Sequence, residues 1–312
     1  MELRQLRYLV GICEAGSLLA ASRRLHVAQP ALSHHVAALE EELGARLFTR
    51  SNRGMAPTDA GRAFLEHARV VLADVERAAS SVRLPGAEIR GDVVVGLPTT
   101  VALVATLPVL QAARAQHPGV RLKLVESHSG YLREWLEAGR LDLSVLFAAG
   151  AGPEPAQRPL LEERLVLVTR PADRPTGREV TLRQAALRPM VLPGRDHGLR
   201  RIIDDACARA GVTLDVLAEI DSLPNIKAAV RAGLASTVLS PGAVAEEVEA
   251  GQLAVATLAR PHITRRVVCA SALTRPLTPA GAAMLALIER VIRGLVQSRS
   301  WPARWVGADA PA

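Results

Sequence analysis

The chain contains 312 residues, of which 49% are hydrophobic, 22% charged and 3% aromatic. This composition excludes a disordered or fibrous protein, and the length predicts two domains. The net charge of +7 permits a nucleic-acid partner, but residues 1–90 hold 12 Arg against 10 Asp and Glu, so only +2 of that charge lies there. A DNA-binding function must therefore rest on local sequence pattern.

The sequence gives little support for secretion, for a disulfide scaffold or for catalysis. Its first ten residues, MELRQLRYLV, carry charges and lack the apolar run of a signal peptide, which predicts a cytoplasmic protein. The three cysteines, Cys13, Cys207 and Cys269, are far apart and form no CxxC pair. Motifs of serine hydrolases, nucleotide-binding loops and zinc peptidases are absent. We therefore expect no enzyme activity, no catalytic residues, no metal site and no cofactor.

An uncharged stretch of 21 residues, 93–113, is about as long as the ~20 residues that span a bilayer. Prolines, a glycine and threonines interrupt it. A buried strand, a polar turn and a buried helix therefore explain this stretch better than a transmembrane helix does.

The first 85 residues have apolar positions at spacings of three and four, which predicts helices. Ser17 is placed to cap a helix over residues 18–25, because its hydroxyl can accept a free N–H of the first turn. His26-Val27-Ala28 forms a short turn, and Gln29-Pro30 opens a second helix. Helix, short turn and helix is the arrangement that presents a second helix to the DNA major groove.

The second helix has an apolar seam and a polar outer edge. The seam consists of Leu32, Val36, Leu39 and Leu43. The outer edge carries hydrogen-bonding side chains, namely Gln29, Ser33, His34 and, at its margin, His35. After Gly44, the run ARLFTRSNRGMAPT predicts a β-hairpin with residues 51–54 at its tip. Arg50 and Arg53 near that tip suit phosphate or minor-groove contact.

Other interpretations of this segment stay open on pattern alone. A helical hairpin without a DNA partner also exposes polar residues, and Arg50 and Arg53 could be ordinary solvated arginines. His34 and His35 point about 100° apart on a helix, so they are poor joint metal ligands.

Residues 58–84 predict one long helix with a heptad seam, because apolar residues recur at intervals of four and three. The seam consists of Phe64, Ala68, Val71, Val75, Ala78 and Val82. At 1.5 Å per residue the helix is about 40 Å long. The seam predicts pairing with a second chain, and packing against its own domain is the alternative.

From residue 91 onward, short β-branched runs alternate with helical segments, which predicts an α/β domain with a parallel sheet. Leu84-Pro85-Gly86 predicts the boundary before this domain, near residue 88. Residues 299–312 are rich in Pro and Ala and lack periodicity, which predicts a loose tail.

Small polar residues follow several predicted strands, at junctions where helix N-termini offer free N–H groups. The junctions are Pro98-Thr99-Thr100, Ser127-His128-Ser129, His197-Gly198-Leu199-Arg200 and Asp221-Ser222-Leu223-Pro224-Asn225. Together they predict a site for a small anionic or hydrogen-bonding ligand. Helix capping alone would also recruit Ser, Thr and Asn to these places.

The stretch from Ser17 to Gly61 resembles the LysR-type transcriptional regulators almost position by position. The shared motifs are Ala20-Ala21, Gln29-Pro30-Ala31-Leu32-Ser33, Leu39-Glu40, Leu43-Gly44, Leu47-Phe48-x-Arg50 and Pro57-Thr58-x-Ala60-Gly61. Leu18 stands where the family usually has Phe, and Ala28 where Ser or Thr is common. The run LPGRDHGLRRIID is weakly similar to the branch of nitrogen-assimilation-control regulators.

The resemblance implies an all-α winged helix-turn-helix domain, a long linker helix and an α/β effector-binding domain of two Rossmann-like lobes, similar to periplasmic binding proteins. The implied boundaries are 1–58 for DNA binding, 59–88 for the linker and dimerisation helix, 89–298 for effector binding and 299–312 for the tail. Within the effector-binding domain, residues 91–162 and 267–298 would form one lobe, and residues 163–266 the other. The implied function is sequence-specific transcription regulation, modulated by a small-molecule effector bound between the lobes.

The resemblance also assigns residues and partners. Contacts with a dyad-symmetric operator in double-stranded DNA are implied for Gln29, Pro30, Ser33, His34, Arg50 and Arg53. The effector-lining positions are Thr99, Thr100, Ser129, Phe147, His197 and Asn225. The expected partners are further copies of the chain, in a homodimer or homotetramer, and RNA polymerase, with no membrane.

Two competing functions are weighed against this one. A stand-alone solute-binding protein would look like residues 91–298, but the first 85 residues and the missing export signal argue against it. Redox sensing through Cys207 is the second, yet no other cysteine lies close in sequence, so we expect a buried inert thiol instead.

Overall fold

The computed structural model describes every residue except 52–53, 82–87, 149–156, 261, 273–275 and 309–312. The chain folds into two compact units, residues 1–87 and residues 88–312. None of the described helices has the length and apolarity needed to cross a membrane.

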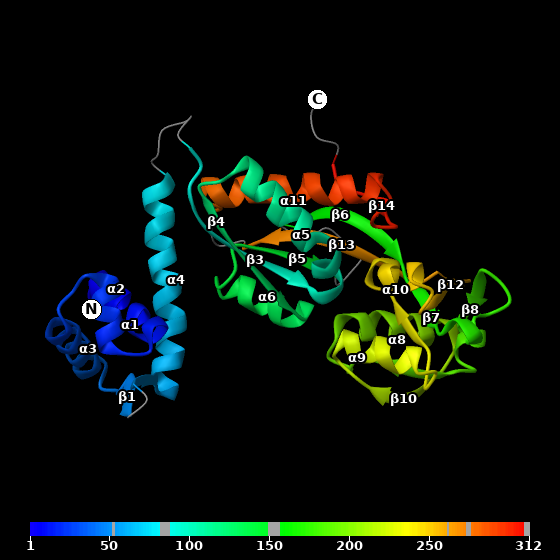
Figure 1. The fold of residues 1–312 in the computed structure, drawn as a ribbon, viewed down its shortest axis with the longest axis horizontal. Helices are drawn as coiled ribbons and strands as arrows, with labels where there is room; N and C mark the ends of the chain where they lie inside the picture. The colour runs from blue at the N-terminus through cyan, green and yellow to red at the C-terminus, as the bar shows by residue number, and fades with distance from the viewer. Residues whose placement is uncertain (52–53, 82–87, 149–156, 261, 273–275, 309–312) are drawn as a thin grey trace. The chain divides into compact units, whose positions relative to one another are not determined.

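The described part of the first unit contains four helices and a hairpin, which Figure 1 shows. Their bounds are α1 (Leu3–Ala15), α2 (Leu18–Leu25), α3 (Gln29–Leu43), β1 (Phe48–Ser51), β2 (Gly54–Pro57) and α4 (Asp59–Ser81). The predicted cap is confirmed, because the Ser17 hydroxyl accepts the Ala20 amide at 3.1 Å. The chain then turns at His26, whose φ of 53° is left-handed, and α3 follows after Val27 and Ala28.

The apolar seam of α3 is confirmed for three of its four members. Leu32 and Leu39 are fully buried and Val36 is nearly so, in a core shared with α1 and α4. The prediction is wrong for Leu43, which is 39% exposed. The helix ends at Gly44 in a left-handed conformation, so its last turn projects beyond the core.

The first lobe of the second unit is a six-stranded sheet in the order β14-β6-β13-β5-β3-β4. Its elements are β3 (Gly91–Pro98), α5 (Thr99–Gln116), β4 (Val120–Ser127), α6 (Ser129–Glu137), β5 (Leu143–Phe147), β6 (Gln157–Arg164), β13 (Thr264–Ser271), α11 (Pro279–Gln297) and β14 (Arg304–Trp305). Helices α5 and α11 cover one face of this sheet and α6 covers the other (Figure 1).

The uncharged stretch 93–113 forms β3 and α5, as the interrupted pattern predicted. The expectation of a parallel sheet is only partly correct. Strands β3, β4 and β5 are parallel, but β13 runs antiparallel to both β5 and β6. The reason is topological, because β13 enters this sheet from the second lobe and therefore points the opposite way.

The second lobe contains a four-stranded sheet, β11-β7-β12-β8, and a parallel pair, β10-β9. Its elements are β7 (Val166–Thr169), η1 (Pro171–Asp173), β8 (Glu179–Thr181), α7 (Leu182–Ala185), β9 (Pro189–Leu192), α8 (Gly198–Ala210), β10 (Asp215–Glu219), α9 (Leu223–Arg231), β11 (Thr237–Leu239), η2 (Pro241–Val244), α10 (Ala245–Glu249) and β12 (Ala254–Ala259). The buried faces of α8 and α9 pack against these strands in one apolar core.

Two crossovers join the lobes, one from β6 to β7 and one from β12 to β13. They run side by side, because the Leu165 amide donates to the Ile263 carbonyl at 2.8 Å. Glu163 and Arg265 are register partners of β6 and β13. They belong to the first lobe, because β6 continues to Arg164 and β13 begins at Thr264, so the expected second lobe of residues 163–266 is too long at both ends.

The predicted loose tail over 299–312 is wrong for its first part. Trp301 is only 1% exposed, and β14 pairs with β6 through Arg304 and Trp305. A tryptophan buries a large apolar surface, which offsets the entropy lost when the segment becomes ordered. Residues 309–312 lie outside the described part of the chain.

Candidate functional site

The exposed edge of α3 presents the residues that the sequence selected for DNA contact. Gln29, Pro30 and His34 are exposed, while Ser33 is half-buried. They occupy the first two turns of α3, where a recognition helix contacts base edges. The N-cap residue of α3, Ala28, makes no side-chain hydrogen bond, so the first turn lacks the cap that a serine would supply.

The neighbouring histidines have different surroundings. The half-buried His35 ring lies 5.1 Å from the Tyr8 ring of α1, so it belongs to the packing between α1 and α3. His34 is exposed, and its ring centroid is 6.1 Å from that of His35. Among the described residues, no group of three His, Cys, Asp or Glu side chains could hold a metal ion.

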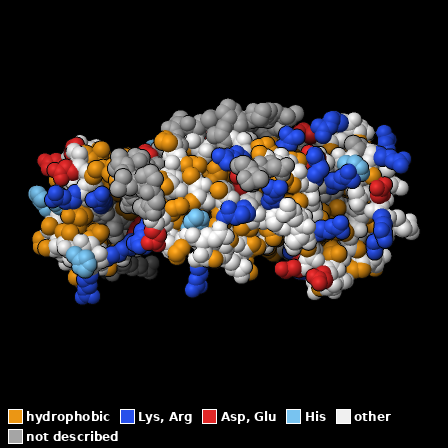
Figure 2. Space-filling model, turned by 90° about the horizontal axis from the view of Figure 1, so that it is seen from above, with side chains coloured by type: hydrophobic (Ala, Val, Ile, Leu, Met, Phe, Trp, Pro, Cys, Tyr) orange, Lys and Arg blue, Asp and Glu red, His pale blue; other side chains and the backbone are white. Residues whose placement is uncertain are grey.

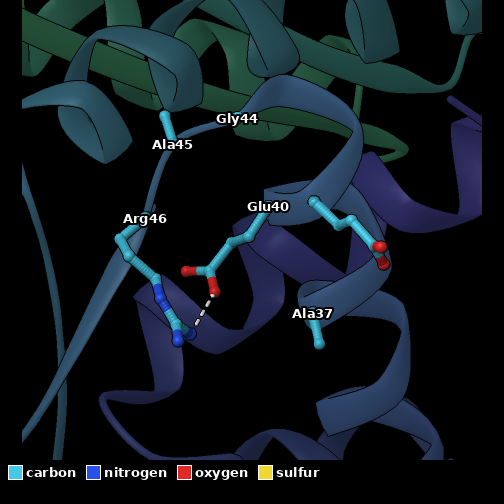
Figure 3. Close-up of a pocket in the computed structure, with 6 residues that line it drawn as sticks. Ala37, Glu40, Gly44, Ala45 and Arg46 are labelled. Carbon is cyan, nitrogen blue, oxygen red and sulfur yellow. Dashed lines mark hydrogen bonds and ion pairs between the residues drawn. The ribbon is translucent and has the colours of Figure 1, made fainter.

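A buried carboxylate that the sequence analysis did not select, Glu40, joins α3 to the hairpin. Its Oε1 accepts the backbone amides of Leu47 at 2.8 Å and Phe48 at 3.1 Å. Its Oε2 accepts Arg46 Nη1 at 2.9 Å, across a shallow pocket of about 320 Å³ (Figure 3). The Leu39-Glu40 motif is therefore structural, because Glu40 orients the start of β1 relative to α3.

The hairpin is also held by backbone contacts that require glycine. Gly54 has a φ of 116°, and a Cβ at that position would lie 2.4 Å from the Gly16 carbonyl oxygen. The adjacent Met55 amide donates to the same carbonyl at 2.8 Å, so the hairpin is fastened to the α1–α2 turn. The side chain of Arg50 and the whole of Arg53 lie outside the described residues, and their DNA contacts stay a prediction.

The long helix α4 divides its predicted seam between two environments. Near its start, Ala68 is 2% exposed and Phe64 packs against the core of its own unit. One turn later Val71 is 41% exposed, Val75 is half-buried and Ala78 is exposed, while Val82 lies outside the described residues. The first part of the seam thus packs within the domain, whereas the later part is only partly covered.

The polar junctions of the second unit meet where its two lobes touch. The rings of His128 and His197 lie 4.6 Å apart, although they precede α6 in one lobe and α8 in the other. A Cβ built at Gly198 would lie 4.0 Å from the Ser129 Cβ. The contacts therefore bring two of the predicted effector residues, Ser129 and His197, close together.

The remaining predicted effector residues are distributed unevenly. Thr100 and Phe147 are 8% and 7% exposed, and both contact the same side chain, Arg265. Thr99 is half-buried in the first turn of α5. Asn225 is exposed in the first turn of α9, and no described hydrogen bond or ring contact joins it to the others.

Arg265 and Glu163 form a buried ion pair that sequence reasoning missed. Arg265 Nε donates to Glu163 Oε1 at 2.7 Å, and Nη2 donates both to the same oxygen and to Thr100 Oγ1, the latter at 3.1 Å. The guanidinium carbon lies 3.8 Å from the centroid of the Phe147 ring. Glu163 Oε2 accepts the indole N–H of Trp301 at 2.9 Å.

A signal for this pair was present in the sequence. Arg265 alternates with the buried Ile263 and Val267, and Glu163 alternates with the buried Leu161 and Leu165. A charged side chain on the buried, apolar face of a strand is tolerated only when an opposite charge is paired with it. Two such charges of opposite sign therefore predict an internal ion pair, once the two strands are known to be neighbours.

Burial lowers the pKa of His197 to about 4, with smaller contributions from the charges of His128 and Arg265, while Asp221 acts in the opposite direction. The imidazole is therefore neutral at pH 7, and its Nδ1 accepts the Leu199 amide at 3.1 Å as the N-cap of α8. Its capping role accounts for the orientation of the ring at the lobe junction.

Neither buried thiol has the properties of a redox sensor. Burial raises the pKa of Cys207, and it raises the pKa of Cys269 to about 12. A reactive cysteine needs thiolate character and access, so both side chains are inert in this structure. All three cysteines are unpaired.

Sequence comparison agrees with the two-unit organisation. Residues 3–62 match the bacterial regulatory helix-turn-helix proteins of the lysR family, and residues 86–293 match the LysR substrate binding domain. The nitrogen assimilation regulatory protein nac of Klebsiella aerogenes is 39% identical over 245 residues, which cover 78% of this chain and 79% of that protein. The weak similarity to nitrogen-assimilation regulators is thereby confirmed.

Solved structures share the fold along nearly the whole chain. A full-length OxyR variant from Pseudomonas aeruginosa aligns with a TM-score of 0.69 over 94% of this chain and 95% of its own, at 24% identity. Full-length CbnR in complex with its target DNA aligns with a TM-score of 0.64 over 94% and 99%, also at 24% identity. Both support a winged helix-turn-helix unit followed by a two-lobed α/β unit.

Proposed function

This chain belongs to the LysR family of bacterial transcriptional regulators, and we propose that it regulates transcription as an oligomer bound to a dyad-symmetric operator. Its first unit is a helix-turn-helix DNA-binding domain and its second is an effector-binding domain. We take residues 1–58, 59–88 and 89–298 as the DNA-binding, linker and effector parts. The site of action is the cytoplasm, where the operator and RNA polymerase are found.

The observation that carries this proposal is the arrangement of α3. Leu32 and Leu39 on its inner side are buried in the core. Near its C-terminal end, Glu40 accepts a hydrogen bond from the hairpin backbone. Its outer edge leaves Gln29 and His34 exposed in the first two turns. A rigid helix with hydrogen-bonding residues on its outer side is what major-groove recognition requires.

General charge attraction explains DNA recognition less well than specific contacts do, because residues 1–90 hold 12 Arg against 10 Asp and Glu. On the face drawn in Figure 2, basic side chains are interspersed with acidic and uncharged ones. Specific contacts from α3, together with phosphate contacts from the hairpin, therefore supply the recognition in this proposal.

Footprinting on the intergenic DNA beside the gene, with competitor DNA and a salt series, tests this function. A protected dyad site is expected, with weaker protection by Gln29→Ala and Ser33→Ala. Arg53→Ala should lower affinity and reduce the salt slope by about 1, as expected for one lost phosphate contact. Arg114→Ala, an exposed change in the effector unit, serves as the control. Unchanged operator affinity in all three test variants would refute the assignment.

The oligomer is supported by apolar surface that a single chain leaves exposed. On α4, Val71 is 41% exposed. On α5, Leu103, Leu107 and Leu110 are 56%, 62% and 47% exposed and recur at four and three residues, so they share one helix face. Sedimentation of the wild type and of Leu107→Glu should show a dimer or tetramer that the substitution weakens.

We further propose that a small anionic effector binds at the junction of the lobes. Ser129 lies near His197 and Gly198 across this junction, Thr100 and Phe147 both contact Arg265, and Thr99 and Asn225 lie in the first turns of α5 and α9. A ligand that contacts both lobes would favour one lobe geometry over another, which changes operator contact in the oligomer. Thr100→Val should abolish the effector response and leave operator binding intact.

A further inference from the structure

A cavity of about 580 Å³ opens at the β14 edge of the first lobe, where β6, β14, the residues after β14 and helix α11 line it. This volume lies within the range of about 300–1,000 Å³ that small-molecule sites occupy. Pro159, which lines the cavity, precedes Glu163 by four residues, which is about 13 Å along β6. The cavity is therefore distinct from the junction of the lobes.

The charged side chains that line the cavity are mostly basic. They are Arg158, Arg290 and Arg293, with one carboxylate, Glu289, so three positive charges and one negative charge leave a balance of +2. Arg158 Nη1 donates to Glu289 Oε1 at 3.3 Å, whereas Arg290 Nη2 donates to the neutral Gln116 side chain at 2.5 Å. A group that carries two negative charges matches this balance.

The wall formed by Trp305 has a hydrogen-bond donor to spare. The indole Nε1 is buried and has no partner among the residues that the structure describes. Trp301 differs, because its indole N–H donates to Glu163 at 2.9 Å. A Cβ at Gly307 would lie 2.4 Å from the Trp305 ring and 2.8 Å from the Pro159 carbonyl oxygen, so glycine is needed for this close backbone approach. The ring is thereby held as a fixed, flat wall.

Aromatic and cationic groups occur together in this cavity. The guanidinium carbon of Arg293 lies 5.9 Å from the centroid of the Trp305 ring, and both side chains line the cavity. Indole rings and guanidinium planes both stack on planar bases, and arginine also binds phosphate oxygens in pairs. Inorganic phosphate would leave the indole unused, and a neutral aromatic compound would leave the positive charge unbalanced.

We propose that this cavity binds a nucleoside monophosphate, with its base against the Trp305 indole and its phosphate bound by Arg158 and Arg290. The dianionic phosphate balances the charge of +2, and the base or sugar offers an acceptor for the indole N–H. This site goes beyond the proposed function and does not depend on it, because no residue of α3 and none of the predicted effector residues lines the cavity.

The test is isothermal titration calorimetry of the full-length protein with adenosine and guanosine 5′-monophosphates at constant ionic strength. Adenosine, ribose 5-phosphate and inorganic phosphate are the matched probes that lack the phosphate, the base, or both the base and the sugar. At least one nucleotide should bind saturably and at least tenfold more tightly than each of these probes, because only the nucleotide uses the ring and the arginines together.

Three variants locate the binding. Ala286 is exposed and lines the cavity, so Ala286→Glu adds a negative charge there without altering the core and should weaken nucleotide binding at least fivefold. Gln297→Glu makes the same charge change at an exposed position about 16 Å further along α11 and should bind like the wild type. Thr100→Val, at the lobe junction, should also bind like the wild type.

Tryptophan emission places the base. Stacking of the base should quench the emission of Trp305, so Trp305→Phe should lose most of the quenching that the nucleotide causes. Phenylalanine keeps a flat ring but lacks the indole N–H, so this variant should still bind the nucleotide in calorimetry, two- to fivefold more weakly. Undiminished quenching in this variant would show that the base does not lie on Trp305.

The other outcomes that would overturn the proposal are equally definite. Ribose 5-phosphate binding as tightly as the nucleotide would exclude a role for the ring, and adenosine binding as tightly would exclude a role for the arginines. Wild-type affinity in Ala286→Glu, or a loss in Thr100→Val, would place the nucleotide elsewhere. Absence of nucleotide binding would refute the site itself and leave the operator footprint and the effector response untouched.

Discussion

The two units of this protein use buried charge in different ways. In the DNA-binding unit, Glu40 is 8% exposed and receives two backbone amides and one guanidinium, so both of its oxygens are occupied. In the effector unit, Glu163 and Arg265 are both buried, and one nitrogen of Arg265 has no described partner. A satisfied buried charge holds two elements in place, whereas an unsatisfied donor lowers the stability of the pair that contains it.

Breaking the Glu163–Arg265 pair should have the largest effect on stability. Arg265→Met leaves a buried carboxylate without its cation, and removal of one partner of such a pair costs about 3–5 kcal/mol. The matched double variant, Glu163→Met with Arg265→Met, should be nearly neutral or stabilising. Urea unfolding followed by tryptophan emission measures the effector unit selectively, because all three tryptophans lie in it. An equal decrease in the free energy of unfolding in both variants would show that the buried charges are not the cause of the destabilisation.

Removal of Glu40 should have the next largest effect, confined to the DNA-binding unit. Glu40→Ala leaves the Leu47 and Phe48 amides without acceptors, at a cost of about 2–3 kcal/mol. Operator affinity should fall with stability, because β1 loses its orientation relative to α3. Glu41→Ala, an exposed change beside the same pocket, is the control. The thermal transition followed by far-UV circular dichroism, together with footprinting, measures both properties.

The stability of the effector unit should depend on pH through His197. Its folded pKa is about 4, below the unfolded value of 6.5, mainly because burial disfavours the charged ring. Between pH 6.5 and 4 the unfolded chain therefore binds a proton that the folded chain does not. Stability is complete above pH 6.5 and should decrease by about 1–3 kcal/mol as the pH falls through this window.

Urea unfolding at pH 7 and pH 4.5 measures this difference. His197→Gln should lose less unfolding free energy between the two pH values than the wild type does. His262→Gln, a change at an exposed position, should lose as much as the wild type. The same loss in His197→Gln would assign the pH dependence to other groups.

The smallest expected effect concerns the start of α3. Ala28 occupies the N-cap without a side-chain hydrogen bond, and Ala28→Ser should stabilise the DNA-binding unit by about 0.5–1 kcal/mol. Ala37→Ser, in an exposed position inside the same helix, should instead be neutral or slightly destabilising. Thermal transitions of the two variants provide the comparison, and equal shifts would exclude capping as the cause.

Several parts of the fold were predictable because their signals are local. The Ser17 cap, the turn at His26 and the buried positions Leu32 and Leu39 depend on residues that are a few positions apart. The mixed sheet was not predictable in this way. The direction of β13 depends on the crossover from the other lobe, and no local pattern reports that path.

The candidate effector site shows the same division. Helix starts at Thr99 and Ser129 follow from the alternation of strands and helices, so the sequence could select them. The central ion pair joins residues that are 102 positions apart, and its tryptophan is a further 36 positions along the chain from Arg265. Trp301 also shows why composition misled the prediction for the tail, since one large side chain orders the segment around it.

The sequence by itself determined the helix-turn-helix, the hairpin, the alternating α/β half and membership of the family, because these depend on short-range periodicity and on contiguous motifs. Only the tertiary structure decided which charged side chains are buried, which groups they contact and which of their donors has no hydrogen-bond partner. The energy of a buried charge depends on partners that distant strands bring within about 3 Å, and that proximity exists only after the chain has folded.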